Sequence, residues 1–152
     1  MENQPKFIVV DGPDGAGKTT IVKEMQNYLT AKGYTVLVGR GLGTGTVAEA
    51  IRASLFNPEL KKTVNYEIYG AIMCLIDCYE TFVVPNLLKN DDKIIVLLDR
   101  YVSSYYAYQV HARSSEKANK MLRDVFNMFG TRHPDAYIYC KVDLDVATHR
   151  LQ

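Results

Sequence analysis

One stretch decides the fold of this chain of 152 residues: Gly12-Pro13-Asp14-Gly15-Ala16-Gly17-Lys18-Thr19. It fits the pattern G-x-x-x-x-G-K-[ST], in which a glycine-rich loop joins a strand to a helix. Residues 6–10 before it form a β-branched run that predicts a buried strand ending at Asp11. Residues 20–32 after it carry apolar side chains at helical spacing, and Gly33 would close that helix. The context of strand, loop and helix therefore predicts a phosphate-binding loop.

The residue types in this loop predict a nucleotide site. Its glycines let backbone N–H groups converge on phosphate oxygens, and the helix N-terminus adds partial positive charge. Lys18 would reach the β- and γ-phosphates, and the Thr19 hydroxyl would ligate Mg²⁺. The plain alternative is a glycine-rich turn with a surface lysine. A dinucleotide loop is excluded because no G-x-G-x-x-G follows either early strand.

Strand and helix patterns alternate along the rest of the chain. The expected strands are 34–38, 93–99 and 136–142, and the expected helices are 46–55, 65–88, 115–129 and one from about residue 145. Pro85 would kink or break the second of these helices, and Ser115 and Gly130 would cap the third. Right-handed crossovers then give the fold class, which is α/β: a three-layer P-loop NTPase fold with a mostly parallel sheet and helices on both faces.

Asp99-Arg100 closes the most apolar of the expected strands. Ligands of open parallel sheets bind beyond the carboxyl ends of the strands. A carboxylate there is the usual second anchor of a Mg²⁺ site, and an adjacent arginine favours an anion. For the pair alone, the alternative is a salt bridge at the end of a strand.

Composition limits the class of protein. With 47% hydrophobic and 23% charged residues, we expect one domain over residues 1–152. The net charge of +1 disfavours a nucleic-acid partner, which a basic surplus would favour. An odd count of three cysteines and a start without signal-peptide character favour reduced thiols in the cytoplasm. The longest charge-free apolar strand candidate, 94–98, is too short to span a membrane.

Four stretches together resemble the thymidylate kinases, within the nucleoside monophosphate kinases. They are FIVVDGPDGAGKTT (7–20), Arg40 with its Gly/Thr-rich turn and Glu49-x-x-Arg52, DRYVSSYYAYQ (99–109), and HPDAYIYCKVDLD (133–145). The resemblance covers nearly the whole chain, and its most specific parts are the P-D-G of the loop and the D-R-Y…S-x-x-A-Y-Q run.

The resemblance implies a role for each matching residue. Those that would bind ATP are Gly12, Asp14, Gly15, Ala16, Gly17, Lys18, Thr19 and Thr20, with Thr19 and Asp99 as the Mg²⁺ ligands. Those that would bind the acceptor monophosphate are Asp14, Arg40, Arg100, Ser104, Tyr105, Tyr108 and Gln109. Asp14 would contact the sugar 3′-hydroxyl, and Tyr108 would leave no room for a 2′-hydroxyl. Lys18, Asp99 and Arg100 would be the catalytic residues, because phosphoryl transfer depends on cationic clamping and alignment.

The chain departs from the family pattern in three places, one of which is Gly41-Leu42 in place of an acidic-Pro pair after the family's arginine. Where the family has a phenylalanine and an arginine that contact thymine, Cys74 and Cys78 stand here, and no arginine lies between Arg52 and Arg100. Tyr79, Tyr105 and Gln109 are candidate replacement donors. The chain is also expected to end before the arginine-bearing LID and the C-terminal helices, which leaves Arg150 as the nearby cation.

We therefore expect a phosphotransferase that moves the γ-phosphate of ATP to a deoxynucleoside monophosphate, with dTMP as the first choice. A nucleotide-binding module with little turnover is the second hypothesis, and a P-loop ATPase or switch is the third. The acceptor arginines argue against the third.

The resemblance also implies a homodimer, with 65–88 as the candidate surface. Buried thiols at Cys74 and Cys78 are favoured over zinc ligands, and a nucleic-acid stacking platform of tyrosines is disfavoured by the charge.

Overall fold

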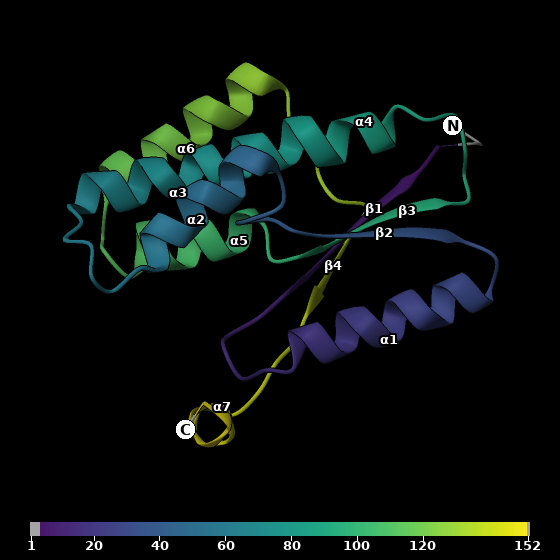
Figure 1. Cartoon of the computed structure of the whole chain (residues 1–152), viewed down its shortest axis with the longest axis horizontal. Coiled ribbons are helices and arrows are strands. Elements are labelled where there is room, and N and C mark those ends of the chain that lie inside the picture. The colour runs from purple at the N-terminus through teal and green to yellow at the C-terminus, as the bar shows by residue number, and fades with distance from the viewer. Residues whose placement is uncertain (1–3, 152) are drawn as a thin grey trace.

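The computed structural model describes residues 4–151, which form a parallel β-sheet with helices on both faces (Figure 1). The strands are β1 (Lys6–Asp11), β2 (Thr35–Arg40), β3 (Ile94–Asp99) and β4 (Ala136–Tyr139), in the order β2-β3-β1-β4. Every pairing in this sheet is parallel. The predicted α/β class is therefore confirmed.

The helices cover the two faces unequally. α1 (Lys18–Ala31) covers one face, and α2 (Thr46–Phe56), α3 (Val64–Cys78) and α6 (Glu116–Phe129) lie on the other (Figure 1). The predicted caps of α6 are confirmed, since Ser115 accepts from the N–H of Ala118 and Gly130 is left-handed. α7 (Leu144–Arg150) follows β4 and lies beside the glycine-rich loop, where Arg150 Nη1 donates to the Gly15 carbonyl at 3.1 Å.

β3 is buried along its whole length because both of its faces are covered. Ile94, Val96 and Leu98 belong to the core on the α3 side. Ile95 and Leu97 belong to the core on the α1 side. This alternation explains the continuous apolar run in the sequence, and it fixes the carboxyl end of β3 between the two cores.

The long helix predicted at 65–88 is present as a continuous helix, Val64–Leu87. It consists of α3, the π-helical turn η1 (Tyr79–Val83) and α4 (Val84–Leu87). The expected disturbance at Pro85 is this π turn, because proline has no N–H to donate and the helix adjusts just before it. Among the described residues, this helix is the one long and apolar enough to cross a membrane, although half of its most apolar window is buried inside the protein, as in a core helix.

The structure differs most from the sequence prediction in two segments, residues 102–111 and the last strand. Residues 102–111 form an unforeseen helical segment, α5 (Val102–Tyr105) and η2 (Tyr106–His111). Its helix propensity is weak, and burial of Tyr105 and Val110 in the α3-side core stabilises it. The strand predicted at 136–142 was too long, because its neighbour β1 ends at Asp11, which accepts the last ladder bond from Cys140 at 2.7 Å.

Candidate active site

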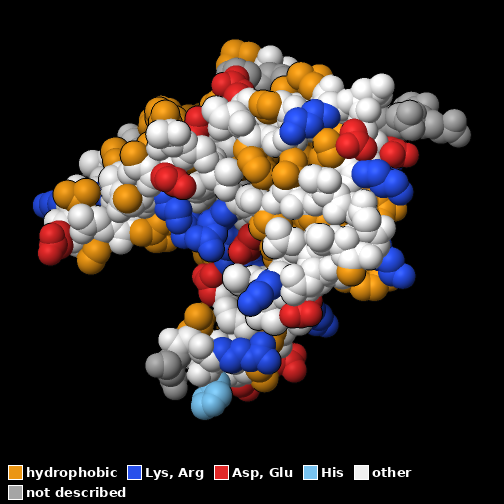
Figure 2. Space-filling model, turned by 45° about the vertical axis from the view of Figure 1, so that its right-hand side comes forward, with side chains coloured by type: hydrophobic (Ala, Val, Ile, Leu, Met, Phe, Trp, Pro, Cys, Tyr) orange, Lys and Arg blue, Asp and Glu red, His pale blue; other side chains and the backbone are white. Residues whose placement is uncertain are grey.

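Two cavities meet at the carboxyl edge of the sheet. The first, the helix-side cavity, has a volume of about 350 Å³ and is lined by residues of α2, α3, α5 and η2. The second, the loop-side cavity, has a volume of about 380 Å³ and is lined by the glycine-rich loop and the ends of β2 and β3. Asp14, Arg52 and Arg100 line both cavities. Figure 2 shows Lys and Arg side chains gathered around a central hollow of the molecule.

The glycine-rich loop adopts backbone conformations that favour glycine. Gly15 and Gly17 have φ angles of +77° and +80°, in the left-handed region. A Cβ atom on Gly12 would lie 2.6 Å from the carbonyl oxygen of Cys140, so the loop passes directly against the end of β4. α1 then begins at Lys18, which places a helix N-terminus behind the loop.

Lys18 folds back over its own loop. Its Nζ atom donates to the Pro13 carbonyl at 2.6 Å, and the residue is buried. Burial, with a smaller effect from the positive charge of Arg100, lowers the pKa of the Lys18 ammonium. The lysine therefore occupies a position in which an anion would stabilise its charged form.

Thr19 and Asp99 place oxygen atoms side by side at the end of β3. Thr19 Oγ1 donates to Asp99 Oδ2 at 3.4 Å, which is a long contact. Among the described residues, Asp99 Oδ1 is buried and has no hydrogen-bond partner. A buried carboxylate oxygen without a partner, next to a hydroxyl, fits the donor set that Mg²⁺ prefers.

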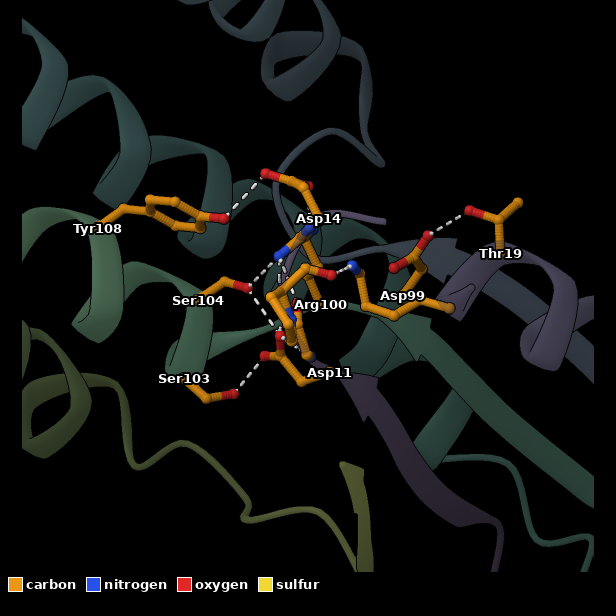
Figure 3. A network of polar contacts seen from close by, with 11 residues as sticks. Asp11, Asp14, Thr19, Asp99, Arg100, Ser103, Ser104 and Tyr108 are labelled. Carbon is orange, nitrogen blue, oxygen red and sulfur yellow. Dashed lines mark hydrogen bonds and ion pairs between the residues drawn. The ribbon is translucent and has the colours of Figure 1, made fainter. Parts of the chain in front are cut away.

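Arg100 is held through both its backbone and its side chain. Its φ of +67° lies in the left-handed region, and its N–H donates to the Val10 carbonyl at 2.9 Å. Its guanidinium donates to the Gly12 carbonyl at 3.1 Å and to Ser104 Oγ at 3.0 Å, and it pairs with Asp14 (Figure 3). The guanidinium is therefore fixed at the junction of the two cavities.

Two carboxylates extend this network on either side of the arginine. Asp11, at the end of β1, accepts hydrogen bonds from Ser104 at 2.9 Å and from Ser103 (Figure 3). Tyr108 donates to Asp14 Oδ2 at 3.0 Å, and the centre of its ring lies 5.9 Å from the Arg100 guanidinium carbon. Burial and the hydrogen bond to Asp14 raise the pKa of Tyr108.

The helix-side cavity has an apolar middle and a polar far end. Its apolar lining consists of Leu42, Leu55, Phe56, Ala71, Cys74 and Tyr105. At the polar end, Arg113 Nε donates to Gln109 Oε1 at 3.0 Å, and Arg113 Nη2 pairs with Glu67. Such a cavity suits a flat, mostly apolar group that carries a few polar edge atoms.

The structure brings together most of the residues that the sequence indicated. Lining the loop-side cavity are Asp14, Gly15, Gly17, Lys18, Thr19, Arg40, Asp99 and Arg100. Lining the helix-side cavity are Asp14, Arg100, Ser104, Tyr105, Tyr108 and Gln109. The remaining three do not line either cavity: Gly12 bonds to Arg100 through its carbonyl, Ala16 is buried in the α1-side core, and Thr20 is exposed on α1.

Two expectations about the long helix do not fit the geometry. Tyr79 is not a replacement donor in the helix-side cavity, because its hydroxyl accepts from the Arg132 N–H at 2.7 Å and its ring lies in the α3-side core. Cys74 lines the cavity, whereas Cys78 is buried in that core. Both thiols are buried, and burial raises the pKa of Cys74 to about 11.

Sequence reasoning assigned no role to three charged residues of the cavities. Arg52 lines both cavities, donates to the Leu42 carbonyl at 2.9 Å and lies 4.5 Å above the Phe56 ring. Burial, followed by the positive charge of Arg40, lowers its pKa. Glu67 and Arg113 form the polar end described above. Only Arg52 had a signal in the sequence, within Glu49-x-x-Arg52.

Comparison with known proteins identifies the family of this chain. The sequence model of the family "Thymidylate kinase" matches residues 10–152. The chain is 31% identical over 148 residues to the thymidylate kinase of Neisseria meningitidis serogroup C, covering 97% of this chain and 70% of that one. It is 33% identical to the thymidylate kinase of a Geobacillus species, covering 97% of this chain and 69% of that one. The chain belongs to the thymidylate kinase family.

A solved structure supports the fold as well. The crystal structure of thymidylate kinase from Ehrlichia chaffeensis superimposes with a TM-score of 0.79 and 24% identity, covering 97% of this chain and 82% of that one. The fold is thus that of a P-loop kinase. Membership of the thymidylate kinase family makes the chain a nucleoside monophosphate kinase, in a family that uses ATP as its phosphate donor.

Proposed function

We propose that this chain transfers the γ-phosphoryl group of ATP to dTMP, giving ADP and dTDP. The observation that carries the proposal is the junction of the two cavities at Asp14, Arg52 and Arg100. A base in the helix-side cavity would direct its monophosphate to this junction, where the phosphates of ATP in the loop-side cavity would meet it. Phosphoryl transfer needs this kind of alignment more than it needs covalent chemistry.

The cations around the junction suit two facing phosphates. Lys18, Arg40, Arg52 and Arg100 line the loop-side cavity, against the carboxylates of Asp14 and Asp99. The lowered pKa values of Lys18 and Arg52 arise partly from neighbouring positive charges, and a bound anion would relieve this repulsion. Lys18 would exchange the Pro13 carbonyl for ATP phosphate oxygens, while Arg40 and Arg100 would clamp the acceptor phosphate.

Mg²⁺ fits the oxygen pair at the end of β3. Thr19 Oγ1 and Asp99 would hold the ion, because Asp99 has a buried oxygen without a partner among the described residues. When bound, the ion would neutralise charge on the transferring phosphate. Asp99 itself lies beside Lys18 and Arg100, so it also balances the local positive charge.

The sugar would lie against Asp14 and the ring of Tyr108. Asp14 Oδ2 already accepts a hydrogen bond from Tyr108, and its other oxygen pairs with Arg100. A 3′-hydroxyl could donate to this carboxylate, while the fixed Tyr108 ring limits the space beside it. The arrangement supports a deoxyribose over a ribose acceptor.

Arg150 is our candidate for the cation that stabilises the transferring phosphoryl group. It lies on α7 and donates to the Gly15 carbonyl in the loop at 3.1 Å. Binding of ATP phosphates at that loop would offer its guanidinium a stronger partner than a carbonyl. An arginine in this role can contribute about 10³-fold to the rate.

We also propose one domain, a cytoplasmic location, a homodimer, and no nucleic-acid or membrane partner. Free, buried cysteines at 74, 78 and 140 support a reducing compartment. Tyr66, Tyr69 and Met73 on α3 are 44–51% exposed and support this helix as the dimer surface.

The test is release of ADP from ATP and Mg²⁺ by the 152-residue chain, across deoxy- and ribonucleoside monophosphates. We expect dTMP to give the highest kcat/KM, with ribonucleotides well below it. If a monophosphate with another base gives the highest kcat/KM, the kinase activity is supported and dTMP is rejected as the preferred acceptor. Binding of monophosphates without ADP release would favour the second candidate, a nucleotide-binding protein with little turnover. Release of ADP that no monophosphate stimulates would reject the acceptor site.

A further inference from the structure

The polar end of the helix-side cavity is built from two elements that face each other across it. Glu67 comes from α3, and Gln109 and Arg113 come from η2 and the turn after it. Arg113 joins the two sides, with Nε donating to Gln109 Oε1 at 3.0 Å and Nη2 paired with Glu67. The side chains of Arg113 and Glu67 are 30% and 29% exposed, so the pair is partly shielded from solvent.

This contact fixes which way the Gln109 amide points. A guanidinium has only donors, so the Gln109 atom that faces it must be the carbonyl oxygen Oε1. The Nε2 group, which has two N–H donors, is then left on the other side of the amide. Glu67 restrains Arg113 from turning away, because it pairs with Nη2, which lies beside Nε on the same edge of the planar guanidinium.

We infer that Arg113, held by Glu67, positions the Gln109 amide so that it donates to a base carbonyl and thereby selects keto over amino pyrimidines. The inference rests on the proposed function, since it assumes a nucleoside monophosphate in the helix-side cavity. Arg113 is a positioning residue here, because it acts through Gln109.

The group that a pyrimidine carries at C4 explains why such a donor would select keto over amino bases. Thymine and uracil present a carbonyl oxygen at C4, whereas cytosine presents an amino group there. A fixed N–H donor satisfies the carbonyl but leaves the amino group facing another donor, and this mismatch costs affinity where the site is partly shielded from solvent. A glutamine free to rotate could serve either base. Cys74, on the facing helix, offers only a weak donor, so it does not replace this contact.

Equilibrium binding of dUMP and dCMP to the whole chain tests this, because these ligands differ at C4 and neither has the thymine methyl group. We expect the unaltered chain to prefer dUMP and Arg113→Met to lower that preference about tenfold, mainly by weakening dUMP. Arg113→Lys keeps a donor-only group and should retain the preference to within about threefold. Arg123→Met, which removes an exposed arginine from α6, is the matched control and should change nothing.

A double-mutant cycle separates positioning from a merely structural role. In a Gln109→Ala background, Arg113→Met should leave the dUMP to dCMP ratio unchanged, since no amide remains to be oriented. Equal weakening of both ligands by Arg113→Met would overturn the inference, as would an unaltered chain that prefers dCMP. Failure of the proposed function would differ, because the unaltered chain would then bind neither pyrimidine monophosphate.

Discussion

The helix-side and loop-side cavities differ in how their polar side chains are held. In the helix-side cavity, contacts between side chains from different elements fix the guanidinium of Arg100, the ring of Tyr108 and the amide of Gln109. In the loop-side cavity, Lys18 bonds to its own loop, and Thr19 reaches Asp99 only through a 3.4 Å contact. One cavity is therefore preorganised, whereas the other contains groups whose present bonds a ligand would replace.

Because of this difference, substitutions in the two cavities should change different measured quantities. Groups in the loop-side cavity gain their main interactions when phosphate charge is present, so removing them should lower kcat with little effect on folding. Groups in the helix-side cavity already support one another in the free protein. Their removal should raise KM, relax specificity and reduce stability together.

The largest effect should come from Lys18→Ala. We expect kcat to fall by about 10³-fold, because the alanine chain lacks the ammonium that would neutralise the transferring phosphate. The midpoint of thermal unfolding should stay nearly unchanged, since the lost hydrogen bond is to the carbonyl of Pro13 in the same loop. Steady-state ADP release and a thermal melt measure the two quantities.

Lys23→Ala is the matched control, since Lys23 is an exposed lysine on α1. It should leave both quantities unchanged. A large fall in melting temperature for Lys18→Ala would contradict the proposed difference between the two cavities, because it would mean that Lys18 stabilises the loop in the free protein.

Arg100→Ala should give the next largest effect and should appear in both stability and KM. We expect KM for dTMP to rise about 10²-fold, because the side chain that would clamp the acceptor phosphate is lost. Asp11 and Asp14 would also lose a positive neighbour, so the protein should unfold at lower temperature. The KM for ATP should change much less.

Arg100→Lys sharpens this test. Lysine keeps the charge but cannot reach Gly12, Ser104 and Asp14 with one planar group, so it should restore only part of the affinity. An unchanged KM for dTMP in Arg100→Ala would mean that the acceptor phosphate does not lie at this junction.

Asp99→Asn should shift the requirement for Mg²⁺. We expect the Mg²⁺ concentration for half-maximal activity to rise about tenfold, because a neutral amide replaces the carboxylate beside Thr19. Titration of ADP release with Mg²⁺ at saturating dTMP measures this shift. Binding of dTMP without Mg²⁺ should be retained, and its loss would place Asp99 in the acceptor site instead.

The difference between the two cavities also explains which site residues could be predicted from the sequence. The loop-side cavity comes largely from one local motif and from the ends of apolar strands, so Lys18, Thr19 and Asp99 could be placed from pattern alone. The helix-side cavity depends on contacts between distant residues, such as Glu67 with Arg113 and Asp14 with Tyr108. No periodicity encodes such pairs.

The helix at 102–111 was missed for a related reason. Its sequence is rich in tyrosine and serine, which are weak helix formers, and core packing of Tyr105 and Val110 stabilises it. The end of β4 was misplaced because it depends on where β1 stops, which is set by the turn into the loop at Gly12. Tertiary contacts decide both boundaries.

The smallest expected effect is a pH dependence confined to the loop-side cavity. The pKa of Lys18 is lowered in the free protein, mainly by burial, so this lysine loses its proton at a lower pH than an ordinary lysine does. Only the charged form can pair with phosphate. ATP affinity should therefore fall by several-fold as the pH rises through this lowered pKa, and ATP binding there should take up a proton.

Binding of dTMP should depend much less on the Lys18 proton, because Lys18 lines the loop-side cavity and is not part of the helix-side lining. Lys18→Arg should remove the alkaline fall in ATP affinity, since arginine does not titrate there. Equilibrium titrations with ATP and with dTMP from about pH 7 to about pH 10 measure both curves. An alkaline fall that persists in Lys18→Arg would assign the titration to another group, whereas parallel curves for the two ligands would show that the cavities respond to proton loss as one site.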